Sequence, residues 1–143
     1  MSTLPKLGRK KEHRERTIRN LATSLVLYEK VRTTTAKAES VVPLLERLIT
    51  KARTGSLAAR RAAKALLFDP NAVSKLFEDL SQRQGTRTSG FLRVTKLPPR
   101  PGDGAAMAQV EFLLTPLETI LQAESKTKVS VRKTAAKTEE PAS

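Results

Sequence analysis

Basic side chains are concentrated near the start of this sequence. Seven of them lie within the fourteen residues from position 6 to position 19: Lys6, Arg9, Lys10, Lys11, Arg14, Arg16 and Arg19. A lysine places a point charge beside a phosphate group, and an arginine adds forked hydrogen bonds to two phosphate oxygens. The cluster therefore predicts contacts with several phosphates, whereas the simpler interpretation is a solvated run of charge.

A second polar group combines two cations with three successive hydroxyls: Arg32, Thr33, Thr34, Thr35 and Lys37. Hydroxyl and backbone N–H groups commonly contact phosphate oxygens, although an ordinary exposed strand edge would have the same composition. Further cations extend this candidate surface along the chain: Arg60, Arg61, Arg83, Arg87, Arg93, Lys96 and Arg100.

Few residues in this sequence could support catalysis. The chain has no cysteine and a single histidine, His13, which excludes a thiol nucleophile, a disulfide framework and the usual zinc sites. The acidic residues are scattered, without the spacing of a general acid–base pair. The loop Gly102-Asp103-Gly104 lacks the lysine and serine of a phosphate-cradling loop. We therefore expect no enzyme activity, no cofactor, no metal site and no small-molecule substrate.

The charge is large and unevenly distributed. The 143 residues include 27 Lys and Arg against 14 Asp and Glu, a formal net charge of +13, of which +5 lies in residues 1–20, +7 in residues 21–115 and +1 in the rest. Such an excess attracts polyanions, although it also fits a basic surface that only confers solubility. No apolar run approaches the roughly 18–20 residues of a membrane span, and the start has no signal-peptide core. We expect an intracellular protein without a membrane partner.

The first half of the chain predicts an arm, two helices and a strand. Residues 1–12 show no apolar period and are expected to be extended and disordered when alone. Apolar residues then recur every three or four positions and predict a helix over about 12–29: Ile18, Leu21, Ala22, Leu25 and Tyr28. The β-branched residues 31–35 predict a strand.

The next helix contains a proline. A stripe across four turns indicates it: Ala38, Val41, Val42, Leu45, Leu48, Ile49 and Ala52. Either Ser40 caps this helix and Pro43 lies in its first turn, or the helix begins near Ala36 and is kinked at Pro43.

The second half predicts two more helices and two strands. Gly55 stops the preceding helix, Ser56 can cap a third helix over 57–68, and Asp69-Pro70 opens a fourth that Gly85 ends. In the fourth, Val73, Leu76, Phe77 and Leu80 are expected to face the core. Alternation over residues 91–97 and 107–114 predicts two half-buried strands joined by a long hairpin loop. A capping box at Thr115 predicts a short helix to about Leu121, and residues 122–143 have the composition of a disordered tail.

This order, α-β-α-α-α-β-β, predicts an α+β fold. A three-stranded sheet is marginal by itself, so the helices should cover its apolar face in a two-layer domain with a small mixed sheet. We expect a basic N-terminal arm over 1–12, one α/β domain over 13–121 and a C-terminal tail over 122–143.

The few aromatic residues bear on how nucleic acid would be bound. Proteins that read single strands stack bases on exposed aromatic side chains. Four of the five aromatics fall on predicted core stripes or at a helix end, namely Tyr28, Phe68, Phe77 and Phe112, and the fifth is Phe91. The sequence therefore favours recognition of folded RNA by its shape and its phosphates.

Eleven short motifs follow one another between residues 8 and 114: Gly8-Arg9, His13-Arg14, Arg19-Asn20-Leu21-Ala22, Ser24-Leu25, Val31-Arg32-Thr33-Thr34, Lys37-Ala38, Leu48-Ile49-Thr50, Ala59-Arg60-Arg61, Lys75-Leu76-Phe77, Gly90-Phe91-Leu92-Arg93-Val94 and Gly102-Asp103-Gly104-Ala105-Ala106-Met107-Ala108. In this order they closely resemble the family of bacterial large-ribosomal-subunit protein seventeen.

The resemblance implies a cytoplasmic structural component of the large ribosomal subunit, bound to ribosomal RNA and beside other subunit proteins. The positions that match the family and are expected to face RNA are Arg9, His13, Arg14, Arg19, Asn20, Arg32, Thr33, Thr34, Lys37, Arg60, Arg61 and Arg93. The charge pattern adds Lys6, Lys10, Lys11, Arg16 and Arg87 to these candidates.

Two other interpretations stay open. The chain could be a free-standing basic protein that compacts DNA or RNA, in which case duplex DNA should bind as tightly as large-subunit RNA. Its third and fourth helices could also dock on another protein, which is compatible with a ribosomal role.

Overall fold

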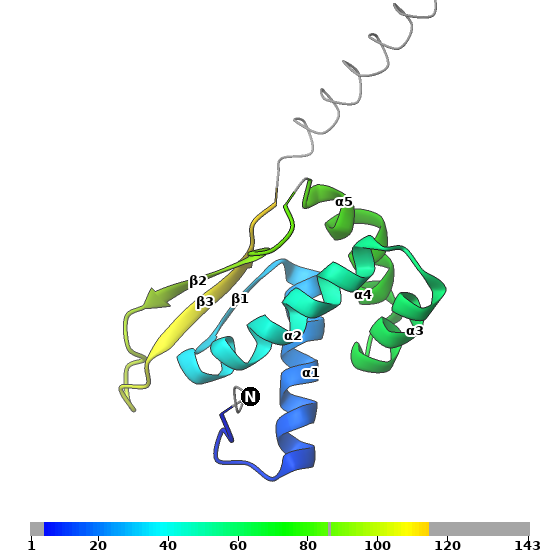
Figure 1. Cartoon of the computed structure of the whole chain (residues 1–143). Coiled ribbons are helices and arrows are strands. Elements are labelled where there is room, and N and C mark those ends of the chain that lie inside the picture. The colour runs from blue at the N-terminus through cyan, green and yellow to red at the C-terminus, as the bar shows by residue number, and fades with distance from the viewer. Residues whose placement is uncertain (1–4, 86, 115–143) are drawn as a thin grey trace, which may run out of the picture.

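The computed structural model describes residues 5–85 and 87–114 (Figure 1). Its elements are, in chain order, α1 (Lys11–Tyr28), β1 (Lys30–Thr34), α2 (Thr35–Arg53), α3 (Leu57–Leu66), α4 (Pro70–Lys75), the π-helical segment η1 (Leu76–Leu80), α5 (Ser81–Arg83), β2 (Leu92–Leu97) and β3 (Met107–Phe112). The α+β class is confirmed. The predicted order is met in part, because the fourth helix is divided into α4, η1 and α5. The predicted helix to about Leu121 and the predicted tail lie outside the described residues.

The helix ends follow local sequence signals. Ser56 Oγ accepts a hydrogen bond from the Ala59 N–H at 3.2 Å, and Asp69 Oδ1 accepts one from the Asn71 N–H at 2.8 Å. These side chains satisfy N–H groups that the first helical turn leaves without a partner. Gly55, just after α2, has φ +63°, a left-handed conformation that glycine adopts at low cost. The predicted caps and the predicted stop are confirmed.

Pro43 lies inside α2, which begins at Thr35. Of the two alternatives for this helix, the early start is therefore correct. Ser40 is not a cap: it is buried, and its hydroxyl donates to the Ala36 carbonyl at 2.7 Å. Pro43 has no N–H to donate to the carbonyl one turn earlier, but residues on both sides of it, among them Val41 and Leu45, are buried in the core, and such packing supplies most of the stability of a helix in a protein.

The sheet is antiparallel, with strand order β1-β3-β2. The expected mixed sheet is wrong. The outer strands β1 and β2 do run parallel to each other, but β3 lies between them and pairs antiparallel with both, so no parallel pair is hydrogen-bonded.

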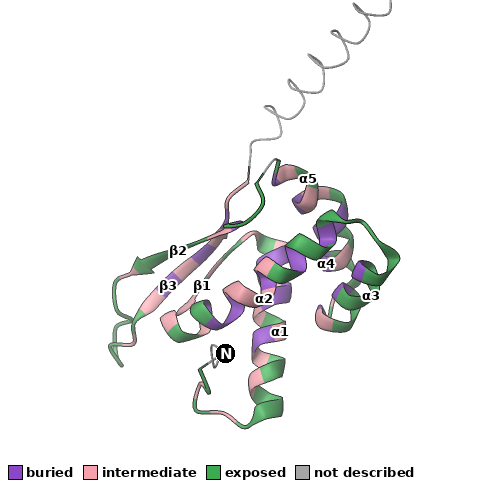
Figure 2. Cartoon of the chain, viewed as in Figure 1, coloured by how far each residue is buried: buried purple, intermediate pink, exposed green. Residues whose placement is uncertain are grey.

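One face of the sheet packs against the helices. Along β3, Ala108, Val110 and Phe112 are buried and alternate with half-buried residues, as predicted. The expectation of a half-buried β2 is wrong, because four of its residues are exposed, including Val94 at 39%. β2 is an edge strand and extends past the helices. In Figure 2 it is a mostly exposed ribbon beside the partly buried β3.

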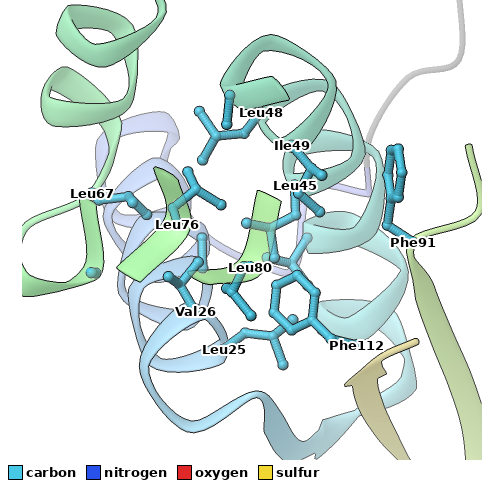
Figure 3. Close-up of a cluster of buried hydrophobic side chains, with 14 of the residues drawn as sticks. Leu25, Val26, Leu45, Leu48, Ile49, Leu67, Leu76, Leu80, Phe91 and Phe112 are labelled. Carbon is cyan, nitrogen blue, oxygen red and sulfur yellow. The ribbon is translucent and has the colours of Figure 1, made fainter. Parts of the chain in front are cut away.

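The core lies where α1, α2, η1 and the sheet meet (Figure 3). The labelled side chains come from each of these elements, among them Leu25, Leu45, Leu76, Leu80 and Phe112. The predicted stripe of α2 is confirmed except that Val42 is only half-buried, and the predicted stripe of the fourth helix is confirmed except for the half-buried Val73.

Tyr28 is 73% exposed, which corrects its expected place in the core. It is the last residue of α1, and Glu29 turns the chain into β1 with φ 62°. Tyr28 therefore stands at the exposed end of α1, whereas Leu25 and Val26, earlier in the same turn, are buried.

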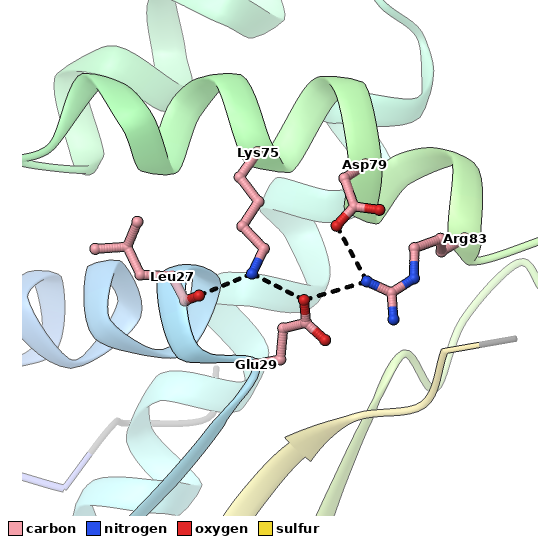
Figure 4. A network of polar contacts seen from close by, with 5 residues as sticks. All are labelled: Leu27, Glu29, Lys75, Asp79 and Arg83. Carbon is pink, nitrogen blue, oxygen red and sulfur yellow. Dashed lines mark hydrogen bonds and ion pairs between the residues drawn. The ribbon is translucent and has the colours of Figure 1, made fainter. Parts of the chain in front are cut away.

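A polar network joins the end of α1 to the consecutive segments α4, η1 and α5 (Figure 4). Lys75 Nζ donates to the Leu27 carbonyl at 2.8 Å and lies 2.8 Å from Glu29 Oε1. Arg83 Nη1 bridges Glu29 Oε1 at 3.1 Å and Asp79 Oδ2 at 3.0 Å. Burial alone would raise the pKa of Glu29, but the hydrogen bonds and charges of Lys75 and Arg83 outweigh it and lower that pKa.

Candidate nucleic-acid interface

The basic residues at the N-terminus are gathered around the first turns of α1. Leu7 and Gly8 both have positive φ, at 56° and 59°, and the turn they form brings Arg9 back over the helix. Arg9 Nη1 donates to Thr17 Oγ1 at 2.5 Å and lies 3.3 Å from His13 Nε2. Leu7 packs partly against the core. The described part of the expected extended arm is therefore a turn anchored on α1.

This anchoring leaves other N-terminal cations exposed. Lys6, Lys10 and Lys11 are exposed and Arg14 is half-buried. Arg16 forms an ion pair with Glu12 at 2.7 Å, with both side chains more than two thirds exposed, and such a surface pair holds its partners weakly. A phosphate could compete for these side chains because water already reaches them.

Arg19 is engaged within the protein. Its Nε donates to the Leu66 carbonyl at 2.9 Å and its Nη2 to the Ala65 carbonyl at 2.5 Å. These are carbonyls of the last turn of α3, which lack helical partners. Arg19 therefore fixes α3 against α1, while the neighbouring Asn20 is exposed.

The strand register places two predicted arginines on the same face of the sheet. Arg32 pairs with Gln109 and Arg93 with Glu111, and alternate residues of β3 point to the face away from the buried Ala108 and Val110. We call this the outer sheet face; it consists of Lys30, Arg32, Thr34, Arg93, Thr95, Leu97, Met107, Gln109 and Glu111. Each of these residues is exposed or half-buried.

A chain of polar contacts crosses the outer sheet face. Arg32 Nε donates to Gln109 Oε1 at 3.4 Å, and Gln109 Nε2 donates to Glu111 Oε2 at 3.1 Å. Glu111 Oε1 lies 4.0 Å from Arg93 Nη1, whose side chain is 61% exposed. Adjacent strands lie about 4.8 Å apart, so the two arginines stand on strands roughly 10 Å apart with one carboxylate between them.

The other predicted residues lie elsewhere. Thr33 pairs with the buried Ala108 and therefore points to the opposite face of the sheet from Thr34. Lys37 is half-buried in the first turn of α2. Arg60 and Arg61 are exposed on α3, which Figure 1 shows at the far end of the molecule from the β2–β3 hairpin. The Arg60 guanidinium lies 5.0 Å from the centre of the Phe77 ring. The predicted residues thus form separate groups and not one patch.

Arg87 lies in the segment between α5 and β2. Its side chain reaches the Gly90 carbonyl at 3.5 Å, and its own carbonyl accepts a hydrogen bond from Arg53 Nη1. Arg53 Nη2 also donates to the Gly85 carbonyl at 3.3 Å. Arg53 therefore holds this segment against the end of α2 and leaves Arg87 exposed.

Sequence reasoning missed two cationic features. Lys30 lies on the outer sheet face opposite Glu111, and the two-residue strand period that links it to Arg32 could have revealed it. Arg47 and Lys51 border a groove between α2 and α3 whose apolar lining is Leu44, Leu48, Ala62 and Leu66. That groove arises from the packing of two helices, so no local pattern indicates it.

The aromatic residues are less buried than their spacing suggested. Phe68 is 50% exposed and Tyr28 is 73% exposed, whereas Phe77, Phe91 and Phe112 are buried. The described residues therefore include two aromatic side chains that other molecules can reach.

Within residues 5–85 and 87–114, no group of three or more His, Asp or Glu side chains is placed to hold a metal ion. In the same part of the chain, no helix combines the length and apolar character needed to cross a membrane.

Comparison with known proteins identifies the family. The family model described as ribosomal protein L17 matches residues 17–113. A relative from Koribacter versatilis, named large ribosomal subunit protein bL17, is 46% identical over 108 residues, which cover 76% of this chain and 67% of the relative. The protein of that name from Carboxydothermus hydrogenoformans is 45% identical over 76% of this chain and 96% of its own length. This chain therefore belongs to the ribosomal protein L17 family.

Proposed function

We propose that this protein is a structural constituent of the large ribosomal subunit that binds ribosomal RNA through its phosphates and its folded shape. Its relatives are named large ribosomal subunit proteins. The family consists of structural ribosomal proteins and not of enzymes, in agreement with the expectation that this chain is not an enzyme. The proposed role needs no cofactor, metal ion, small-molecule substrate or membrane.

The observation that carries the RNA-binding proposal is the charge on the outer sheet face. Its register brings together Lys30, Arg32 and Arg93 from the two edge strands, against the single carboxylate of Glu111. The Arg93–Glu111 pair is long and exposed, so it contributes little stability and can be exchanged for a phosphate. Thr34 and Thr95 add hydroxyl groups to the same surface, which suits phosphate and sugar oxygens.

The N-terminal cations supply a second contact region. Lys6, Lys10 and Lys11 are exposed beside the start of α1, and Arg60 and Arg61 add charge on α3. Because these groups lie on different sides of the domain, an RNA fold that surrounds the protein satisfies more of them than a single straight duplex. Recognition by shape and phosphate contact is the common mode for structured RNA.

Within a bacterial cell the protein is then located in the cytoplasmic ribosome, next to neighbouring large-subunit proteins. The groove between α2 and α3, with its apolar lining, is the described surface best suited to a protein neighbour. Docking of the helices on another protein is therefore a complement to RNA binding.

Sedimentation tests the proposal. The tagged protein should sediment with the large subunit in a sucrose gradient and remain there after a moderate salt wash. Recovery only in the ribosome-free fractions would contradict it. A competition assay addresses the compaction alternative. Unlabelled large-subunit RNA should displace the protein from labelled large-subunit RNA far more effectively than duplex DNA does.

A further inference from the structure

Phe68 is an exposed apolar residue, and a hydrogen bond of its backbone N–H fixes its position. It follows α3, where the preceding Leu67 is 3% exposed while Phe68 is 50% exposed. The Phe68 N–H donates to Thr23 Oγ1 at 3.2 Å, and Thr23 in turn donates to the Arg19 carbonyl at 2.9 Å. These contacts with α1 fix the position from which the ring projects.

A guanidinium group lies over this ring. Arg19 Cζ is 4.3 Å from the centre of the Phe68 ring, within the range of a cation–π contact. Two donors of the same guanidinium are occupied by the Leu66 and Ala65 carbonyls, so the cation cannot easily leave the ring. Half of the surface of Phe68 stays accessible although Arg19 covers part of it, which leaves ring surface for another planar group.

The charges around the pair favour an anionic polymer. Arg16 lies one turn before Arg19 on α1, and Lys64 is exposed one turn before Phe68. The acid next in the chain, Asp69, is engaged in capping α4 through the Asn71 N–H at 2.8 Å. Glu12, near the start of α1, is paired with Arg16, and the exposed Glu15 lies one turn before Arg19.

An aromatic ring and an arginine plane are the groups on which unpaired bases stack. Hydrogen bonds hold the Arg19 guanidinium and the Phe68 backbone in place before binding, so little conformational entropy would be lost when a base is placed on the pair. An aliphatic protein side chain would contact only the ring, whereas a base can stack on an aromatic ring and on an arginine plane alike.

We propose that the Arg19–Phe68 pair is a stacking site for an unpaired nucleobase of the bound RNA. The inference rests on the proposed RNA-binding function and extends it. Besides phosphate and shape contacts, the protein holds one nucleotide that is turned out of its helix, at the junction of α1 with the end of α3.

Binding of the full-length protein to deproteinised large-subunit ribosomal RNA, measured over a salt series, tests the site. Phe68→Leu keeps an apolar side chain but removes the ring, and it should weaken binding roughly fivefold or more, as expected when one base no longer stacks. The salt dependence should not change, because the substitution removes no cation. Phe68→Trp should bind like the unsubstituted protein, and Tyr28→Leu serves as a control for the removal of an exposed aromatic side chain elsewhere.

Ultraviolet crosslinking followed by mass spectrometry supplies an independent measurement. The unsubstituted protein and Phe68→Trp should each give an RNA crosslink at position 68 to an unpaired nucleotide, and Phe68→Leu should lose it. If the unsubstituted protein binds the RNA but Phe68→Leu binds equally well, or if no crosslink maps to position 68, the stacking site is refuted and the RNA-binding function stands. If the unsubstituted protein shows no preference for this RNA over duplex DNA, the proposed function itself fails and the stacking site with it.

Discussion

The carboxylate of Glu46 accepts a hydrogen bond from the backbone N–H of Phe91 at 2.8 Å. The same oxygen accepts a second bond from the Leu92 N–H at 3.1 Å. Glu46 lies in the middle of α2 and Phe91 immediately precedes β2, so a single side chain fixes the point at which the edge strand leaves the core. Phe91 is fully buried beside it.

Replacement of Glu46 by alanine should therefore destabilise the fold. Two backbone N–H groups would lose an ionised acceptor, and we expect the free energy of unfolding to fall by about 2–3 kcal/mol. Urea denaturation followed by circular dichroism measures the change. Glu39→Ala, on an exposed position of the same helix, is the matched control and should change stability by less than about 0.5 kcal/mol. Equal effects of the two substitutions would contradict the role assigned to Glu46.

The network around Glu29 should make stability depend on pH. The pKa of Glu29 is lower in the folded state than in the unfolded chain because, although burial alone would raise it, Lys75 and Arg83 stabilise the carboxylate more strongly. This contribution is complete above the ordinary value of 4.5 and is lost as the pH falls through the lower folded value. Glu29→Gln should lower the free energy of unfolding at pH 7 by about 1–2 kcal/mol and should flatten its decrease below pH 4.5. Parallel pH curves for the two proteins would exclude this role.

The hairpin loop between β2 and β3 contains a forked ion pair. Arg100 Nε and Nη2 donate to the two carboxylate oxygens of Asp103 at 3.0 and 2.5 Å. These hydrogen bonds, together with one from the Ala105 N–H, lower the pKa of Asp103 from 3.8 to about 2. In Arg100→Gln, an NMR titration of the carboxyl carbon should show the pKa of Asp103 raised toward 3.8. An unchanged titration would mean that Arg100 does not hold the carboxylate in solution.

Local signals predicted much of the fold. The caps at Ser56 and Asp69 and the stop at Gly55 depend on interactions within a few residues, so the sequence is sufficient to locate them. Tyr28 and Val94 were misplaced because their exposure depends on where α1 ends and on how far the helices extend over the sheet. Pro43 was ambiguous for the same reason, since its tolerance inside α2 depends on packing against the rest of the core.

The candidate site was predictable as a composition but not as an arrangement. The sequence contained the cations, yet only the pairing of β1 and β2 with β3 shows that Arg32 and Arg93 share a face and that Thr33 does not. Arg19 was predicted to face RNA because of its charge and its family motif. Its guanidinium is held by carbonyls more than forty residues away, an interaction that no local pattern indicates.

The N-terminal cations should contribute to the salt dependence of RNA binding. Lys6 and Lys10 are exposed, and the double substitution Lys6→Gln/Lys10→Gln leaves the packing of Leu7 in place. The slope of log K against log salt should become shallower by roughly 0.7 for each phosphate that is no longer neutralised, the value for single strands. Glu12→Gln/Glu15→Gln changes charge in the same segment without removing a cation and should not make the slope shallower. An unaltered slope in the lysine variant would show that these lysines do not bind phosphate.

The outer sheet face is the central element of the proposed interface, and a salt titration of its arginines tests it most directly. Arg32→Gln/Arg93→Gln should bind large-subunit ribosomal RNA more weakly, with a slope of log K against log salt that is shallower by roughly 1.5. Lys96→Gln, on the same edge strand but in register with the buried Ala108, should leave the slope close to that of the unsubstituted protein. The same slope in all three proteins would contradict the assignment of this face to RNA.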